Sequence, residues 1–352
     1  MTLRLIGIGG LGKMLGPSAT HLKANKAAIY LRMYDRGTSG NFRDACRIAW
    51  RQAGTTLVST YKELIGDGDF DGLLICAGKN GDDYKIIKEI ISLLKKNQKK
   101  YFILHFSTVS CEFVRATFKF CETHDVYYAN YPLTGGAKGA VSAKMLILAS
   151  GNKDFYNRLL PMLQAIGVPN YFGEDIARAA AIKFIGHVMV FHGLLGISLA
   201  TILQKNIFNF STLNAEQIEF FDFLNNGSGG TKQWDVTLRP ALQNNNWCDG
   251  FLVKHAVVDA IYTAELLIEN NIPLSLLLPL LEVALLFTYL LKNTQEKELA
   301  TAAIAELIAK EPITIQDFIA KNLFLDSRAC LKNCVALLPE ESQRSLMLEV
   351  TY

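Results

Sequence analysis

The first residues with chemistry to offer form a glycine-rich run near the amino end that matches the spacing G-x-G-x-x-G. The run follows an apolar stretch over residues 3–8 and opens a helical pattern, which is the context that a dinucleotide-binding turn requires. The first glycine permits the tight turn, the second admits a pyrophosphate, and the third lets helix and strand pack closely. Backbone N–H groups and the positive end of the helix dipole would then hold the phosphates. The residues assigned to this turn are Gly7, Gly9, Gly10, Leu11 and Gly12.

An acidic residue stands where the adenosine ribose of such a cofactor is recognised. Asp35 ends a second apolar run, over residues 28–34, and follows Gly12 by 23 positions. A carboxylate there accepts hydrogen bonds from the ribose hydroxyls and repels a 2′-phosphate, which favours NAD. Arg36 beside it can pair with that phosphate, so NADP stays open as the alternative. Two further arginines that can do so less readily are Arg32 and Arg43.

A lysine within an apolar helical stretch is the candidate for proton transfer. Burial of Lys183 would disfavour its ammonium form and lower its pKa towards neutrality. Such an amine can take a proton from an alcohol as hydride leaves and return it in the reverse direction. His187 lies one turn further on the same face and can orient the substrate or share the proton. A lysine that reaches solvent and a packed core histidine are the structural alternatives.

Two further segments offer groups for a small anionic substrate. Thr134, Gly135 and Gly136 combine a hydroxyl with close backbone N–H groups that can bind a carboxylate or an oxyanion. Lys254 can pair with a substrate carboxylate, or it is a solvated charge on a helix. Ser107 and Thr108 follow the apolar run over residues 101–106, where they either approach the cofactor or cap a helix that starts near Cys111.

In chain order, these motifs resemble the β-hydroxyacid dehydrogenase family, which includes 3-hydroxyisobutyrate dehydrogenase and 6-phosphogluconate dehydrogenase. The resemblance covers roughly residues 3–292. Ser107-Thr108 resembles the family's Asp-x-Ser-Thr near the nicotinamide, and residues 131–140 resemble its substrate segment. The resemblance implies that Lys183 is the catalytic lysine, that Lys254 faces the substrate cleft, and that the enzyme moves a hydride between NAD(P) and a small β-hydroxy acid or its semialdehyde.

The sequence also departs from the family pattern at residues around the expected cleft. His105 replaces an Asp of the family pattern, Thr134 replaces a Ser, and Ala177 and Ala179 replace two glycines. Gly186 and His187 replace a pair that usually carries an amide side chain, and His255 replaces a second Asp. These departures leave two alternative functions open on the same fold. One is an imine-reductase-like enzyme, a class that usually lacks the lysine. The other is a non-catalytic dinucleotide-binding sensor or scaffold.

Short apolar runs alternate with helical patterns over the first 175 residues, which predicts an α/β fold with a Rossmann-type, doubly wound parallel sheet. The runs predicted as strands lie at 3–8, 28–34, 72–77, 101–106, 126–129 and 144–149, the last of them turning the sheet edge antiparallel. From residue 176 the pattern is almost wholly helical. We therefore predict a dinucleotide-binding domain over 1–175, an all-α cleft-closing domain over 176–310 with a long helix at 176–203, and a helical appendage over 311–352.

The composition narrows the class of partner. The chain has 36 basic and 33 acidic residues and a pI near 8.3, without the basic excess typical of nucleic-acid binding. Its seven cysteines form no C-x-x-C pair, which argues against a zinc site or a disulfide scaffold and favours a reducing cytoplasm. The amino end shows no secretory signal pattern. The expected partner is thus a small molecule, and no metal is expected.

Two apolar stretches raise the mean hydropathy to +0.18, over residues 177–203 and 272–291. Each is about as long as a membrane span. A lysine within a span is costly to insert, so we predict a buried helical domain and no membrane. Because a monomer rarely exposes so large an apolar patch, we also predict a homodimer formed through this domain.

Overall fold

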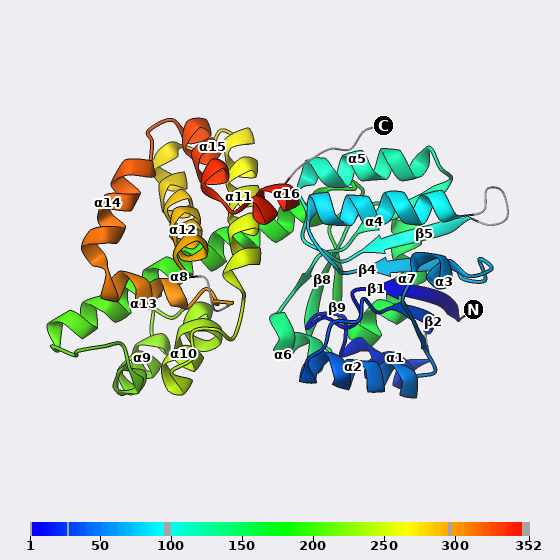
Figure 1. The fold of residues 1–352 in the computed structure, drawn as a ribbon, viewed down its shortest axis with the longest axis horizontal. Helices are drawn as coiled ribbons and strands as arrows, with labels where there is room; N and C mark the ends of the chain where they lie inside the picture. The colour runs from blue at the N-terminus through cyan, green and yellow to red at the C-terminus, as the bar shows by residue number, and fades with distance from the viewer. Residues whose placement is uncertain (1, 27, 95–99, 295–297, 347–352) are drawn as a thin grey trace. The chain divides into compact units, whose positions relative to one another are not determined.

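The structure is a computed structural model that describes residues 2–26, 28–94, 100–294 and 298–346. It divides into two compact units (Figure 1). The first comprises residues 1–183 with the carboxyl-terminal segment from Arg344, and the second comprises residues 184–343. The domain limits predicted from the sequence stay predictions, and each unit is described by itself below.

The first unit contains a parallel sheet with the strand order β3-β2-β1-β4-β5-β6. Its strands are β1 (Leu3–Ile8), β2 (Ala28–Tyr34), β3 (Thr56–Val58), β4 (Gly72–Ile75), β5 (Tyr101–His105) and β6 (Val126–Asn130). This is the strand order of the doubly wound dinucleotide-binding sheet. The Rossmann-type fold predicted from the sequence is therefore confirmed, although β3 was not among the predicted strands.

Helices cover both faces of this sheet. They are α1 (Ser18–Asn25), α2 (Asn41–Gln52), α3 (Tyr61–Ile65), α4 (Asn80–Leu93) and α5 (Cys111–Glu122). Figure 1 shows α4 and α5 on one side of the strands and α1 and α2 on the other. A parallel sheet covered on both faces needs apolar side chains pointing both ways. Successive residues Leu5 and Ile6 are accordingly both fully buried.

The predicted strand over 144–149 forms, but not at the edge of the main sheet. It becomes β8 (Met145–Ala149) of a separate sheet, antiparallel to β7 (Leu133–Thr134) and parallel to β9 (Gly167–Tyr171). The expectation that it extends the main sheet was wrong. The short α6 (Gly136–Val141) fills the connection from β7 to β8, and α7 (Lys153–Ile166) connects β8 to β9. This crossover through α7 returns the chain parallel to β8.

The second unit is helical throughout the described residues, apart from one isolated bridge between Leu252 and Ala300. Helix α8 (Arg178–Ile207) begins in the first unit and continues into the second. The further α-helices are α9 (Ile218–Asn225), α10 (Arg239–Asn244), α11 (Val253–Glu269), α12 (Leu274–Asn293), α13 (Ala303–Lys310), α14 (Pro312–Asn322), α15 (Ser327–Leu337) and α16 (Glu340–Leu346). The last residues of α16, from Arg344, belong to the first unit. Helix α15 packs against α11 and α12, so residues after 310 contribute to the helical core.

Two of these helices, α8 and α12, are long and apolar enough to cross a membrane, which is weak evidence because core helices pass the same test. In α12, the residues from Leu280 to Phe287 are buried within the unit, with the exception of Glu282. Helix α8 is less covered: 39% of its most apolar window is buried. Its exposed apolar residues are Ile185, Met189, Leu199, Leu203 and Ile207. At 100° per residue these five side chains share one face of the helix.

Candidate active site

The glycine turn lies at the carboxyl end of β1, where the chain order reverses between β2 on one side and β4 on the other. Ligands of doubly wound sheets bind at this reversal. The turn closes through a hydrogen bond from Gly12 N to Gly9 O at 3.0 Å. The helix expected directly after Gly12 instead begins at Ser18. Pro17 explains the delay, because the residue before a proline is disfavoured in helical conformation.

The backbone of this turn fits against the loop after β4 in a way that only glycine permits. Gly9 has φ +87°, and a Cβ on it would lie 2.0 Å from the carbonyl oxygen of Cys76. On the other side, the indole of buried Trp50 donates a hydrogen bond to Gly10 O at 2.6 Å. The turn thus presents bare backbone at the switch point, which fits the pyrophosphate of a dinucleotide.

Gly9→Ala is expected to destabilise the first unit by about 2–5 kcal/mol and to weaken nucleotide binding at least tenfold, because strain and a backbone clash add. Gly54→Ala is the matched control. Gly54 has the same φ of +87° but open space around its Cβ position, so this variant carries only the strain, about 1–2 kcal/mol. Urea unfolding and nucleotide titration of both variants provide the measurement. Equal losses in the two variants would contradict the clash.

Asp35 lies at the carboxyl end of β2 and is already paired. Arg47 of α2 donates from Nε to Oδ2 at 2.7 Å and from Nη2 to Oδ1 at 2.9 Å, and Gly37 N also donates to Oδ1 at 2.9 Å. The hydrogen bonds from Arg47 are the main reason that the pKa of Asp35 is lowered. Arg36 beside it is exposed. Arg32, by contrast, is bound to Asp69 and to the Leu64 carbonyl, so it is not available for a phosphate.

Ser107 lies after β5, and its hydroxyl accepts a hydrogen bond from Ala77 N at 3.1 Å, which ties the loops after β4 and β5 together. Thr108 follows it and is half-buried. The alternative that these two residues cap the next helix was wrong. Ser110 is the N-cap of α5, since its hydroxyl accepts from Phe113 N at 3.2 Å.

Three buried polar side chains form a hydrogen-bonded chain, and its histidine, His105, replaces the aspartate of the family pattern. Only this histidine was identified from the sequence. The His105 ring lies 2.7 Å from Asp83 Oδ2 through Nε2 and 2.8 Å from the Tyr128 hydroxyl through Nδ1. All three side chains are fully buried. Burial raises the pKa of Tyr128 well above its ordinary value, so its phenol stays protonated. The chain joins α4, β5 and β6 beneath the cofactor edge of the sheet.

Lys183 lies beside the predicted substrate segment in the first unit. Its Nζ donates to Leu133 O at 2.9 Å, and Leu133 directly precedes Thr134 in β7. Gly135 and Gly136 follow with φ +118° and +64°, conformations that favour glycine. The structure therefore brings the lysine and the substrate segment together. The side chain of Lys183 is half-buried, less than the sequence analysis expected.

Small residues and a serine fix the start of α8, which carries this lysine. Ala177 and Ala179 are fully buried, and Ser150 at the end of β8 accepts a hydrogen bond from Ala179 N at 3.0 Å. Alanine, where the family pattern has glycine, is thus still small enough for the helix to approach β8 closely. Lys183 lies one turn further along the same helix.

The remaining predicted residues lie in the second unit. His187 is 5% exposed, with Nε2 at 3.8 Å from Asp259 Oδ2. Its ring contacts the aromatic rings of Phe191 and Phe251. Lys254 forms an exposed ion pair with Glu298. In the structure, Lys254 is thus a solvated charge and His187 is a packed histidine. Their roles in a site stay predictions.

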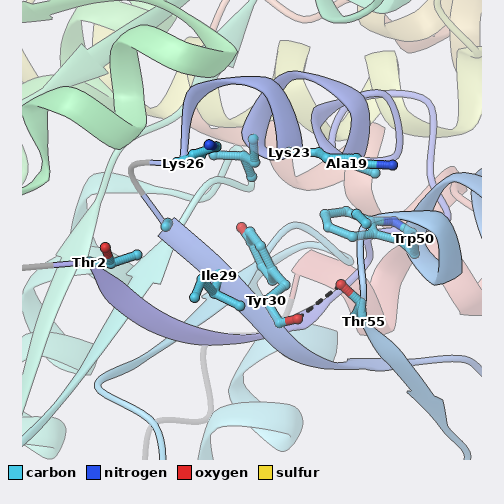
Figure 2. Close-up of a pocket in the computed structure, with 11 residues that line it drawn as sticks. Thr2, Ala19, Lys23, Lys26, Ile29, Tyr30, Trp50 and Thr55 are labelled. Atoms are coloured by element: carbon cyan, nitrogen blue, oxygen red, sulfur yellow. Dashed lines mark hydrogen bonds between the residues drawn. The ribbon is translucent and has the colours of Figure 1, made fainter.

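A hollow of about 350 Å³ lies at the amino end of β2, the end of the strand away from Asp35. Figure 2 shows Lys23 of α1 and Lys26, which follows this helix, above β2, and Thr55 bonded to the Tyr30 carbonyl. Helix α2 contributes Trp50 and the segment after it. Because nucleotides bind at the carboxyl ends of the strands, this hollow is not the cofactor site.

Comparison with known proteins agrees with this geometry. Residues 5–178 match the family described as the NAD binding domain of 6-phosphogluconate dehydrogenase. An uncharacterised oxidoreductase of Synechocystis is 23% identical over 265 residues, 74% of this chain and 84% of the relative. The solved structure of 3-hydroxyisobutyrate dehydrogenase from Salmonella typhimurium superposes with a TM-score of 0.71 at 17% identity, over 87% of this chain and 99% of that chain. An imine reductase from Myxococcus stipitatus, solved with NADP+, gives 0.53 at 14% identity, over 87% and 100%.

The sheet order, the glycine turn at the switch point and the matched NAD-binding domain define a dinucleotide-binding oxidoreductase. The match over residues 5–178 supports the β-hydroxyacid dehydrogenase family, which the sequence motifs resemble. Its cofactor is NAD or NADP.

Proposed function

We propose that this protein transfers a hydride between a nicotinamide cofactor and a small β-hydroxy acid or its semialdehyde. The observation that carries the proposal is the hydrogen bond of Lys183 Nζ to Leu133 O, which holds the amine next to Thr134-Gly135-Gly136. A general acid or base must stand within hydrogen-bond reach of the proton that it moves, and a substrate bound by this segment satisfies that condition.

In the proposed reaction, each group of the chain has its own role. When bound, the nicotinamide supplies or accepts the hydride. The Thr134 hydroxyl, which makes no hydrogen bond to another described residue, and the N–H groups of Gly135 and Gly136 bind the substrate's carboxylate. Lys183 takes the alcohol proton at Nζ in oxidation and returns it in reduction, while Leu133 O keeps the amine oriented. Ser107 and Thr108 are assigned to the nicotinamide end of the cofactor.

Two further residues, both in the second unit, keep as proposals the roles predicted from the sequence. His187 follows Lys183 by one turn of α8 and is proposed to orient the substrate or to share its proton. Lys254 is proposed to pair with a substrate carboxylate. Because Lys254 is now paired with Glu298, a substrate must compete with that exposed ion pair, which is weak in water.

A screen of NADH and NADPH oxidation against small semialdehydes tests the proposal directly. We expect turnover with at least one semialdehyde that carries a carboxylate, and none with the matching compound in which the carboxylate is an ester. The structure shared with the imine reductase supplies the alternative activity. Reduction of cyclic imines without any semialdehyde turnover would favour that alternative. Tight nucleotide binding without turnover of any substrate would favour the non-catalytic sensor or scaffold.

We also propose that the protein is a cytoplasmic homodimer, with the apolar face of α8 at the interface. The support is the exposure of aligned apolar side chains, with Met189 75% and Leu203 60% exposed. We expect the mass of a dimer by light scattering at micromolar concentration. Met189→Glu is expected to yield monomers. Ile313→Glu on α14, at an equally exposed position of 74%, is the control and should leave the dimer intact. A monomeric parent protein would refute the interface.

A further inference from the structure

The acid that would recognise the adenosine ribose is largely occupied by a neighbouring arginine. Two N–H groups of Arg47 and the N–H of Gly37 reach the carboxylate of Asp35 at 2.7–2.9 Å. The two side chains are only 16% and 13% exposed, so the pair is partly shielded from water. Arg47 also donates to the Thr38 carbonyl at 2.7 Å and to Asp44 at 2.5 Å, which fixes it across the loop from β2 to α2.

This pairing removes most of the acceptor capacity that a ribose needs. A carboxylate offers about four acceptor positions. Among the described residues three hydrogen bonds already use them, two on Oδ1 and one on Oδ2 of Asp35. The 2′- and 3′-hydroxyls of NAD together would donate two hydrogen bonds. Asp35 can therefore accept only one of them without losing one of its present hydrogen bonds, to Arg47 or to Gly37.

The same pairing cancels the charge that would repel a 2′-phosphate. Residues 35–51 hold four arginines and two aspartates, a net charge of +2. Arg36 is exposed beside the pair, and it makes no hydrogen bond or ion pair within the part of the chain that the structure describes. Helix α2 begins at Asn41 next to this loop, with Gly40 at its N-cap and no side chain capping it. Free N–H groups at a helix start attract phosphate.

We infer that this chain binds NADP in preference to NAD, and that Arg47 is the residue that determines the preference by holding Asp35 in an ion pair. Arg36 then faces the 2′-phosphate with no competing free carboxylate. The inference rests on the proposed function only in using the same nucleotide site. It reverses the preference for NAD drawn from Asp35 in the sequence, because the partner of Asp35 lies 12 residues away on another element.

Equilibrium titration of the full-length protein with NADPH and with NADH, followed by nucleotide fluorescence, tests the inference without any turnover. We expect NADPH to bind at least tenfold more tightly, since one added ion pair to phosphate is a charge-assisted bond. The advantage should shrink as salt is raised, because exposed charges are screened. Equal affinities, or tighter binding of NADH, would overturn the inference.

Three variants identify the residue responsible. Arg47→Gln frees Asp35, so NADPH should bind at least tenfold more weakly while NADH binds as before or more tightly. Arg36→Gln leaves the pair intact, so it should weaken NADPH alone. Arg51→Gln removes an equal charge from the same helix without breaking a bond to Asp35, and both affinities should stay within about threefold.

Asp35→Asn separates this inference from the usual role of such an acid. If Arg47 already occupies Asp35, the variant should bind NADPH no more weakly and NADH within about threefold of the parent. A loss of NADH affinity of tenfold or more would show that Asp35 serves the ribose, and would overturn the inference even if Arg47→Gln failed to fold. Binding of neither nucleotide would overturn it as well. Normal NADPH preference without turnover would contradict only the proposed function.

Discussion

Lys183→Ala is expected to lower kcat by about 10²- to 10⁴-fold, the range that a positioned acid or base contributes. Affinity for the nucleotide should stay within a few-fold, because the glycine turn and the β2 loop do not involve this residue. The hydrogen bond from Nζ to Leu133 O, which this variant loses, is worth about 0.5–1.5 kcal/mol. Steady-state kinetics with the best substrate from the screen, together with a nucleotide titration, provide the measurement.

Lys144→Ala supplies the control for that experiment. Lys144 is an exposed lysine between α6 and β8, outside the substrate segment of residues 131–140, and its replacement removes the same charge from nearby. Its kcat should stay within about twofold of the parent. Thr134→Val should raise KM more than it lowers kcat, because it removes a binding hydroxyl. Unchanged turnover in Lys183→Ala would refute the mechanism, and an equal loss in Lys144→Ala would reduce it to a general charge effect.

The second large effect concerns stability and the buried chain of Asp83, His105 and Tyr128. Asp83→Leu or His105→Leu is expected to cost about 3–5 kcal/mol, because each leaves the other partner buried without its counterpart. That is a large fraction of the 5–15 kcal/mol by which a domain is usually stable. Urea titrations followed by circular dichroism measure the loss. Arg115→Ala, which breaks an exposed ion pair with Asp175, should cost less than about 1 kcal/mol.

An apolar version of the chain should recover much of that loss. The triple variant Asp83→Leu, His105→Leu and Tyr128→Phe removes every polar member at once. Replacing a whole buried set by apolar residues is often neutral for stability, because no member is left buried without its partner. Asp83 Oδ1 is already buried without a hydrogen bond to any other described residue, so the native arrangement is not optimal for stability. Additive losses of about 6 kcal/mol or more in the triple variant would show that packing at these positions, and not pairing, holds the elements together.

The sequence predicted the elements whose signals are local. β1 and β2 have the predicted bounds because each is a continuous apolar run, and a strand buried on both faces produces such a run. β9 escaped because Gly167 and Pro169 are poor strand residues, and pairing with β8 overrides that preference. The delayed start of α1 is a local signal too, because Pro17 disfavours a helical conformation at the residue before it.

Residues whose role depends on a distant partner were harder to predict from the sequence. Lys183 could be proposed from the sequence because a lysine within an apolar helix is unusual, and its role stays a prediction. The pairing of Asp35 could not, because Arg47 is one of several arginines on α2 and only the path of the loop decides which one reaches back. Asp83 looked like an ordinary acid in the first turn of a helix, and its contact with His105 depends on how α4 lies on the sheet.

Trp50 gives the first unit an optical property of its own. The chain has three tryptophans, and the other two, Trp234 and Trp247, belong to the second unit. The Trp50 indole is buried and bonded to the carbonyl of Gly10, within the turn predicted to bind the pyrophosphate. With the other two indoles replaced by phenylalanine, the ultraviolet emission of the protein comes from this single position. Spectroscopists thus have an intrinsic label inside the glycine turn, with no dye to attach.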